Sequence, residues 1–280
     1  MKKRICIAQI GFTPDIGRHI RKIKNIITQN KEADLVVFPE LILHGHPSVD
    51  KPEGYLYRRI KKYYDALDDK SDDLYKFVKS NDARVIIGEL KGTPEGFYNT
   101  ATYIDRDRTE SYMKAHVHWT ENFVPGRMLK VFTTPLGRVG ITICFDSAFP
   151  EVWRVLSLKG ADIIVNISAV PRTFPVKYMC RRLEGAAINN QVFIVYANRP
   201  GSFFSGNSAV YDPRGETVVR AEGKESVIHA EIDLGAIKKW RGEEQLYQHR
   251  QPLLYRDIVK QHGMWPPQVS GRRRKANGRE

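Results

Sequence analysis

Three residues that could carry out nucleophilic chemistry occupy the same kind of position in the sequence. Glu40 follows the apolar run DLVVFP, Lys114 ends SYMK, and Cys144 ends GRVGITIC. Each comes just after a segment with the pattern of a buried strand, and in α/β sheets ligands bind at the carboxyl ends of strands. A thiol needs a base to become a strong nucleophile, and a nearby cation stabilises the oxyanion that forms when it attacks a carbonyl. The three residues could therefore act together as a catalytic site if the strand ends that carry them meet, which their positions in the sequence do not show.

The elements that must position these residues alternate between strands and helices along the chain. Short apolar runs between turn signals predict strands, and apolar residues at three- and four-residue spacing predict helices. This alternation indicates the α/β class, while hairpins late in the chain add antiparallel pairs to a mixed sheet. The strands are predicted at Arg4–Ile10, Asp34–Phe38, Arg84–Leu90, Tyr98–Asp105, Gly137–Cys144, Asp162–Ser168, Gln191–Asn198, Asn207–Asp212, Glu216–Ala221 and Ser226–Ile232. The helices are predicted at Ile16–Ile27, Asp72–Ser80, Phe149–Lys159, Val176–Asn190 and from Asp233 to about His249.

The bulk composition is that of a globular protein. The 280 residues are 41% hydrophobic and 28% charged, and no apolar stretch approaches the roughly 18 residues of a membrane span. The N-terminal apolar run stops at Gly11, short of a secretory signal. The three cysteines, Cys6, Cys144 and Cys180, form no C-x-x-C pair, which argues against a disulfide framework or a cysteine zinc site. We therefore expect a soluble cytoplasmic protein with free thiols.

A formal net charge of +13 raises the alternative of a basic nucleic-acid-binding protein. The last ten residues, GRRRKANGRE, hold five basic residues and one acidic residue, and the remaining excess is spread among alternating charges. This distribution is typical of a solvated surface with a basic tail, so it argues against nucleic acid as a partner. We predict one catalytic domain over residues 1–263 and a C-terminal arm with a basic tail over residues 264–280.

Three blocks of sequence resemble the nitrilase (carbon–nitrogen hydrolase) superfamily. They are DLVVFPEL, SYMKAHVHWTENFVPG and GRVGITICFDSAFPE, in that order, with further similarity in GADIIVNISA, NNQVFIVYANRPG and SGNSAVYDPRGE. The resemblance runs from Arg4 to about Asp233, and three blocks in register are far more specific than any one of them. It implies a four-layer αββα sandwich with mixed β-sheets. It also implies a homodimer or higher homo-oligomer and no metal or organic cofactor.

The resemblance also implies a role for each residue of the site. Cys144 is the nucleophile, Glu40 the base that takes its proton, and Lys114 the cation that stabilises the oxyanion together with the backbone N–H of Phe145. Glu40 would return the proton to the departing amine, leaving a thioester for water to hydrolyse. Glu121, seven residues after Lys114, matches an additional catalytic glutamate that orients Lys114 or the water.

The substrate implied by the resemblance is a small linear amide or an N-carbamoyl amine. Nitrilases usually carry Trp-Glu directly after the cysteine, whereas this chain has Phe145-Asp146, so a nitrile is the secondary alternative. Arg172, if it faces inward, favours a substrate carboxylate. The residues predicted to bind the substrate are His116, Trp119, Asp146, Ser168, Ala169 and Arg172. For Asp146, a structural hydrogen bond to its own turn is the favoured role.

A metal-dependent amidohydrolase is the alternative from another class of enzyme. The pairs His44-Gly45-His46 and His116-Val117-His118 would each place two imidazoles on one side of an extended chain. The further histidines and the aspartate that such a site needs do not follow convincing strands. We therefore predict no metal site.

Overall fold

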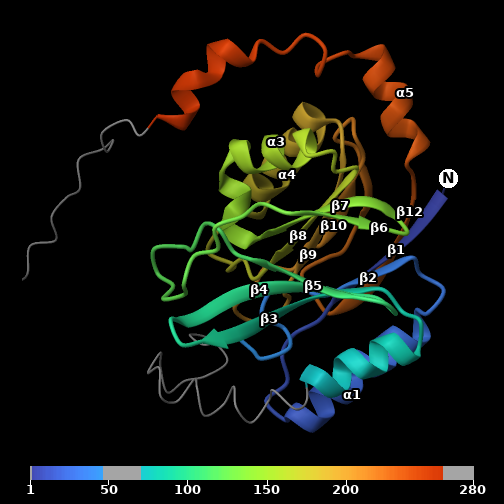
Figure 1. Cartoon of the computed structure of the whole chain (residues 1–280). Coiled ribbons are helices and arrows are strands. Elements are labelled where there is room, and N and C mark those ends of the chain that lie inside the picture. Colours follow the sequence, from blue (N-terminus) through green and yellow to red (C-terminus); the bar gives the residue numbers. More distant parts are fainter. Residues whose placement is uncertain (1, 47–70, 261–280) are drawn as a thin grey trace, which may run out of the picture. The chain divides into compact units, whose positions relative to one another are not determined.

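Two mixed six-stranded sheets lie face to face in the first of the chain's two compact units, Met1–Trp240 (Figure 1). The strand order is β12-β1-β2-β3-β4-β5 in one sheet and β11-β10-β9-β8-β7-β6 in the other. The structure is a computed structural model that describes residues 2–46 and 71–260. Within these residues, no helix has the length and apolar character needed to cross a membrane.

The first sheet consists of β1 (Lys2–Gln9), β2 (Leu35–Val37), β3 (Val85–Thr93), β4 (Gly96–Ile104), β5 (Thr109–Met113) and β12 (Ser226–Asp233). The second consists of β6 (Val131–Thr134), β7 (Gly137–Ile143), β8 (Ile163–Ser168), β9 (Phe193–Asn198), β10 (Ala209–Tyr211) and β11 (Thr217–Arg220). Strands β1, β2 and β3 run parallel in the first sheet, and strands β7, β8 and β9 run parallel in the second. The strands next to each parallel group pair with it antiparallel.

The central strands carry apolar residues on both faces because both faces are buried. In β1, Ile5 and Ile7 point into the core between the sheets, whereas Cys6 and Ala8 point to the outer face. The same alternation sorts the side chains of β8, whose residues Ile163, Val165 and Ile167 face the inner core. Continuous apolar runs with no period are the expected pattern for strands covered on both sides.

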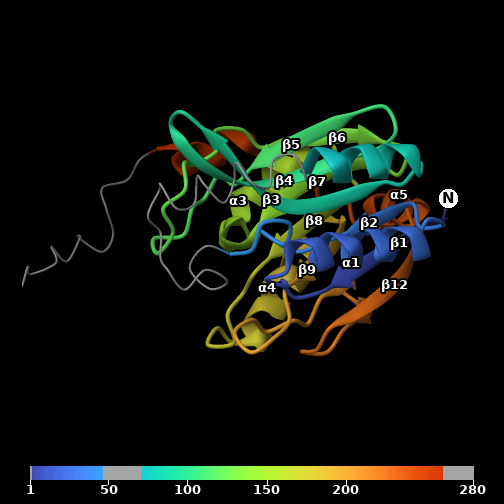
Figure 2. The same cartoon turned by 90° about the horizontal axis from the view of Figure 1, so that it is seen from below.

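Helices cover the outer face of each sheet. Apolar residues of α1 (Ile16–Gln29) and of a helix that includes residues 71–80 pack on the first sheet, and the two helices lie side by side in Figure 2. Helices α3 (Pro150–Leu158) and α4 (Val176–Asn190) cover the second sheet. This arrangement confirms the predicted four-layer αββα sandwich with mixed sheets.

The topology brings several strand ends to one edge of the first sheet. β2 and β3 run parallel. β4 pairs antiparallel with both β3 and β5, so β5 runs in the same direction as β2 and β3. The carboxyl ends of β2 and β5 therefore lie at the same edge, and Glu40 and Lys114 follow these two ends.

The structure differs from the predicted elements at three places. Strands β5 and β6 were not predicted, because they are short edge strands with polar residues and a weak apolar pattern. Lys114 thus follows β5 directly. The helix expected to reach His249 is α5 (Gly235–Glu243), which ends just after Gly242, a residue with poor helix propensity.

The second unit, Arg241–Glu280, includes the short helix η2 (Pro252–Val259). The predicted boundary between residues 263 and 264, and the arm beyond it, lie outside the described residues and stay predictions.

Candidate active site

Glu40 lies in a tight loop directly after β2 and is 1% exposed. The loop passes so close to β3 that a Cβ atom built on Gly88 would lie 2.4 Å from the carbonyl oxygen of Pro39 and 2.6 Å from the Cα of Glu40. The next residue, Leu41, has a φ of +51°, in the left-handed region that non-glycine residues rarely adopt. The position of the carboxylate is therefore set by close backbone packing.

Lys114 continues the ladder between β4 and β5. Its N–H donates to the carbonyl of Asn99 (2.9 Å), and its carbonyl accepts from the N–H of Gly126 (2.8 Å). The side chain is 1% exposed, which is rare for a lysine and requires charged partners.

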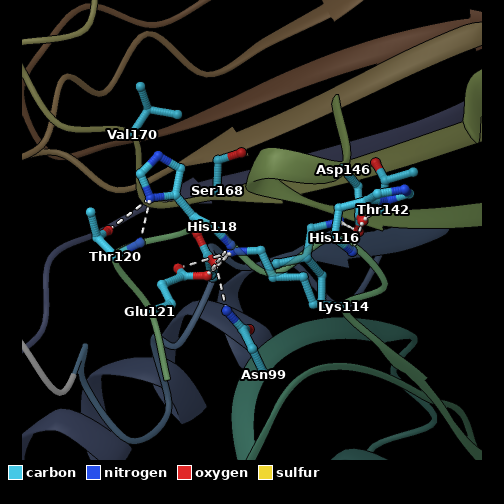
Figure 3. A network of polar contacts seen from close by, with 12 residues as sticks. Asn99, Lys114, His116, His118, Thr120, Glu121, Thr142, Asp146, Ser168 and Val170 are labelled. Carbon is cyan, nitrogen blue, oxygen red and sulfur yellow. Dashed lines mark hydrogen bonds and ion pairs between the residues drawn. The ribbon is translucent and has the colours of Figure 1, made fainter. Parts of the chain in front are cut away.

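Two carboxylates provide those partners. The ammonium Nζ of Lys114 lies 3.0 Å from Oε1 of Glu40 and 2.8 Å from Oε2 of Glu121. Figure 3 shows Lys114 reaching toward Glu121 and Asn99 at one end, with His116 and Asp146 near its other end. The structure thus brings together Glu40, Lys114 and Glu121, three residues that the sequence analysis predicted for the site.

The charges within this cluster set its protonation. Burial alone would lower the pKa of Lys114, but the charges of Glu40, Cys144 and Glu121 hold that pKa above its usual value. Burial pushes the pKa of Glu40 up, yet the charge of Lys114 brings it below its ordinary value. Burial raises the pKa of Glu121. At neutral pH the site therefore contains a lysine cation beside an ionised Glu40.

Cys144 follows β7 and begins the short helix η1 (Cys144–Ala148). Its φ of +44° places it in the left-handed region, and such strain is often found where a side chain must be aimed at a substrate. Burial and the charge of Glu40 raise the pKa of its thiol, while Lys114 and a hydrogen bond from the backbone of Ala169 oppose that rise. The thiol therefore keeps its proton near neutral pH and needs a base.

Asp146 links the turn of Cys144 to the segment of Lys114. It is fully buried, and its Oδ2 accepts hydrogen bonds from the hydroxyl of Tyr112 (2.8 Å) and the N–H of Ile143 (3.0 Å). Its Oδ1 lies 2.8 Å from the backbone N and 2.9 Å from Nδ1 of His116. Both oxygens are thus engaged within the protein. These bonds hold the turn, the role that the sequence favours for Asp146, and contact of Asp146 with a substrate stays a prediction.

Aromatic side chains that follow Cys144 contact the histidine and tryptophan rings that follow Lys114. The ring of Phe145 meets those of His118 and Trp119 edge to face, at centroid distances of 4.9 Å and 5.5 Å. His116 stacks on Phe149 at 3.8 Å, and Trp119 is 79% exposed. The backbone N–H of Phe145 as an oxyanion donor, and His116 and Trp119 as substrate contacts, stay predictions.

The other predicted pocket residues differ in their surroundings. Ser168 is fully buried and its hydroxyl donates to Oδ1 of Asn166 (2.7 Å), whereas the backbone of Ala169 faces the sulfur of Cys144. Arg172 is exposed, and its Nε donates to the carbonyl of Gly201 at 2.7 Å. Its contact with a substrate carboxylate stays a prediction.

Sequence reasoning missed Asn99 and Tyr112. The side-chain Nδ2 of Asn99 donates to Oε1 of Glu40 at 2.7 Å, and Tyr112 holds Asp146. Both lie inside strands, β4 and β5, so neither has the strand-end position that singled out the other residues.

The histidines of the two H-x-H pairs make separate contacts. Nδ1 of His44 accepts from the N–H of Leu90 (3.0 Å), and the His46 ring lies 6.0 Å from the ring of Phe204. His118 stacks on Trp119. In the described part of the chain, no group of three or more His, Cys, Asp or Glu residues is arranged to hold a metal ion.

Gly88→Ala is expected to lower activity about 10²-fold, because its new Cβ must displace the loop that carries Glu40. Overpacking of this kind also costs about 1–3 kcal/mol of stability. Steady-state kinetics and chemical denaturation measure the two effects. Gly185→Ala in α4 is the matched control, because its Cβ meets nothing within 4 Å. Wild-type kinetics in Gly88→Ala would show that the loop tolerates the shift.

Protonation of His44 is expected to make stability depend on pH. Burial, and then the charge of Lys91, lower the pKa of His44 to about 3 in the folded state. The unfolded histidine titrates near pH 6.5. The contribution of neutral His44 to the free energy of unfolding is therefore complete above that pH and is lost as the pH falls toward 3. Between pH 6.5 and 4.5 we expect wild type to lose about 2–3 kcal/mol more than His44→Asn, whose Oδ1 can still accept from Leu90.

Urea denaturation across this pH range measures the difference in slope. His229→Gln, a change at an exposed histidine, should keep the wild-type slope. If the free energy of unfolding changed with pH equally in wild type and in His44→Asn, His44 would not be held neutral by burial in the folded protein.

Both the sequence and the fold of this chain are similar to those of known proteins. A family model described as Carbon-nitrogen hydrolase matches residues 4–242. An omega-amidase of Saccharomyces cerevisiae is 25% identical over 288 residues, covering 92% of this chain and 96% of that protein. An N-carbamoylputrescine amidase of Arabidopsis thaliana is 26% identical over 294 residues, covering 94% and 97%. The crystal structure of a carbon–nitrogen hydrolase from Helicobacter pylori G27 aligns with a TM-score of 0.82 at 21% identity, covering 94% of this chain and all of that one.

Proposed function

The chain belongs to the carbon–nitrogen hydrolase family of the nitrilase superfamily, and from this premise we propose that it cleaves a linear amide or N-carbamoyl bond with Cys144 as nucleophile. The observation that carries the proposal is the buried ammonium of Lys114 between the carboxylates of Glu40 and Glu121. An ammonium held in a fixed position can stabilise the negative charge of a tetrahedral intermediate.

The proposed reaction begins with transfer of the Cys144 proton to Glu40 as the sulfur attacks the carbonyl carbon. Lys114 and the backbone N–H of Phe145 stabilise the oxyanion. Glu40 then gives the proton to the departing amine, and the C–N bond breaks to leave a thioester on Cys144. Glu40 next takes a proton from water as the water oxygen attacks the thioester carbon. The C–S bond then breaks, Glu40 returns the proton to the sulfur, and the acid leaves with the Cys144 thiol restored.

Glu121 acts through Lys114 in this scheme. With Lys114 between two carboxylates, the ammonium keeps its place while Glu40 gains and loses a proton. The Glu121 carboxylate also accepts from the backbone N–H of His118 (3.1 Å), so it is fixed from a second side.

The substrate class rests on the relatives. Proteins similar over nearly the whole chain are named omega-amidase and N-carbamoylputrescine amidase, and both names describe hydrolysis of small linear amides or carbamoyl compounds. Two further relatives, each 29% identical to this chain, are named as a nitrilase and a probable nitrilase, so the names alone do not separate the two classes. We rank amides and N-carbamoyl amines before nitriles because Phe145-Asp146 follows Cys144, where nitrilases usually carry Trp-Glu. A homo-oligomer, tested by light scattering, and a cytoplasmic location stay predictions.

Ammonia release from amides, N-carbamoyl amines, N-carbamoyl amino acids and nitriles tests the proposal. Turnover should survive a strong chelator and disappear after treatment with a thiol alkylator. Rapid quenching should leave an acyl adduct on the peptide that contains Cys144. Loss of turnover after treatment with the chelator would favour the metal-dependent amidohydrolase instead.

A further inference from the structure

Asn99 contacts two of the three residues that carry out the proposed reaction. It lies on β4 and is fully buried. Its side-chain Nδ2 donates to Oε1 of Glu40 at 2.7 Å, and its backbone carbonyl accepts from the N–H of Lys114 at 2.9 Å. One residue therefore fixes both the carboxylate and the start of the segment that carries the ammonium.

The orientation of the Asn99 amide follows from chemistry. An ionised carboxylate only accepts hydrogen bonds, so the NH₂ group must face Glu40, and a flipped amide would place two oxygens against each other. Lys114 donates to the same oxygen, Oε1, at 3.0 Å. Both side-chain donors to Glu40 thus converge on one of its two oxygens.

We propose that Asn99 is a positioning residue that, together with Lys114, occupies Oε1 of Glu40 and so directs Oε2 to receive the proton of Cys144. The inference rests on the proposed function, because it takes Glu40 as the base. An oxygen that accepts two hydrogen bonds is less basic than its neighbour. The proton passes from Sγ to Oε2 as the C–S bond forms, and Asn99 keeps its own protons throughout.

The amide also helps to keep Glu40 ionised, as its hydrogen bond lowers the pKa of that carboxyl. The other titratable groups that act on Glu40 electrostatically, or feel its charge, are Lys114, His46, Cys144, Glu121, His118 and Tyr196. All of them remain when Asn99 alone is changed. A shift in the titration of Glu40 is then traced to the amide.

Asn99→Leu and Asn99→Asp, compared with wild type, test the inference. Leu removes the donor, and the isosteric Asp replaces it with a second carboxylate. We measure two profiles between pH 4 and 9: kcat/KM on a substrate of the panel, and the rate at which iodoacetamide alkylates Cys144, located by peptide mass. The acid limb is the part of each profile that falls at low pH. In Asn99→Leu this limb should move up by about one pH unit, so that the rate at a given acidic pH falls roughly tenfold. In Asn99→Asp the limb should move further, because the two carboxylates repel each other.

Asn190→Asp is the matched control. Asn190 is also buried, and its Nδ2 donates to the carbonyl of Ala186 in the outer layer (2.9 Å). The change should lower stability while leaving the acid limb in place. The thermal midpoint of every variant is measured alongside, so that loss of folding is separated from loss of positioning.

Each outcome decides the question. Acid limbs that coincide with wild type in folded Asn99 variants would mean that the residue only packs, and the inference would be overturned. An Asp variant that behaves like wild type would overturn it even if the Leu variant failed to fold. Alkylation profiles that shift in the expected order, in an enzyme that turns over none of the panel, would support the role of Asn99 and reject the proposed substrate class.

Discussion

Cys144→Ala is expected to lower kcat/KM by about 10⁴-fold or more while the protein keeps its fold. The change removes the proposed nucleophile, and neither Glu40 nor Lys114 can replace it, since one serves as the base and the other as the cation. Cys144 is partly exposed and loses only its sulfur atom, so the cost in stability should be within about 1 kcal/mol. Ammonia release and thermal unfolding measure the two quantities.

Cys180→Ala is the matched control, because Cys180 is a buried free thiol in α4. That change should reduce stability slightly and leave turnover intact. Cys144→Ser is a stricter test, since a hydroxyl at the same position is far harder to deprotonate than a thiol. Turnover in Cys144→Ala equal to wild type would refute the nucleophile and revive the interpretation of the H-x-H pairs as metal ligands.

The central strands and their helices could be predicted from the sequence because burial on both faces leaves an unmistakable apolar run. The prediction for α4, Val176–Asn190, agrees with the structure at both ends. β8 was predicted within one residue of its start, Ile163. Edge strands are different, since they need little apolar surface, and the polar β5, TESYM, gave no such pattern.

Glu40 and Cys144 were found because each follows a buried strand, and Lys114 and Glu121 because their block, SYMKAHVHWTENFVPG, resembles the family. Their partners could not be found in this way. Asn99 lies in the segment FYNTATYI, and a polar residue within a strand usually faces solvent. The pairing of β4 with β5 places its carbonyl against Lys114, and the loop after β2 brings Glu40 to its amide.

The partners of Asp146 likewise depended on geometry. Its position two residues after Cys144 made it a pocket candidate, yet the sequence does not reveal that Tyr112 and His116, from the segment around Lys114, reach its two oxygens. Contacts between segments some thirty residues apart arise from sheet packing, which a local pattern does not encode.

Lys114→Met is expected to lower turnover strongly and also to destabilise the protein. Loss of the cation should reduce kcat/KM by about 10³-fold, the effect of removing one oxyanion donor. Met keeps the length of the apolar stem, so the main cost comes from Glu40 and Glu121, two buried carboxylates left without their cation. Removing one member of a buried ion pair costs about 3–5 kcal/mol. Lys159→Met is the control, because Lys159 is exposed and should contribute less than about 1 kcal/mol.

The stability lost by Lys114→Met should depend on pH with a definite sign. Without the ammonium, burial raises the folded-state pKa of Glu40 and Glu121 above the unfolded value of about 4.3. Their contribution is then present below that value and is lost as the pH rises through the folded-state pKa. Urea denaturation should therefore find the gap between wild type and variant larger at pH 8 than at pH 5. A gap that stays constant with pH would mean that the two carboxylates do not depend on Lys114 for their charge, and the electrostatic account of the site would fail.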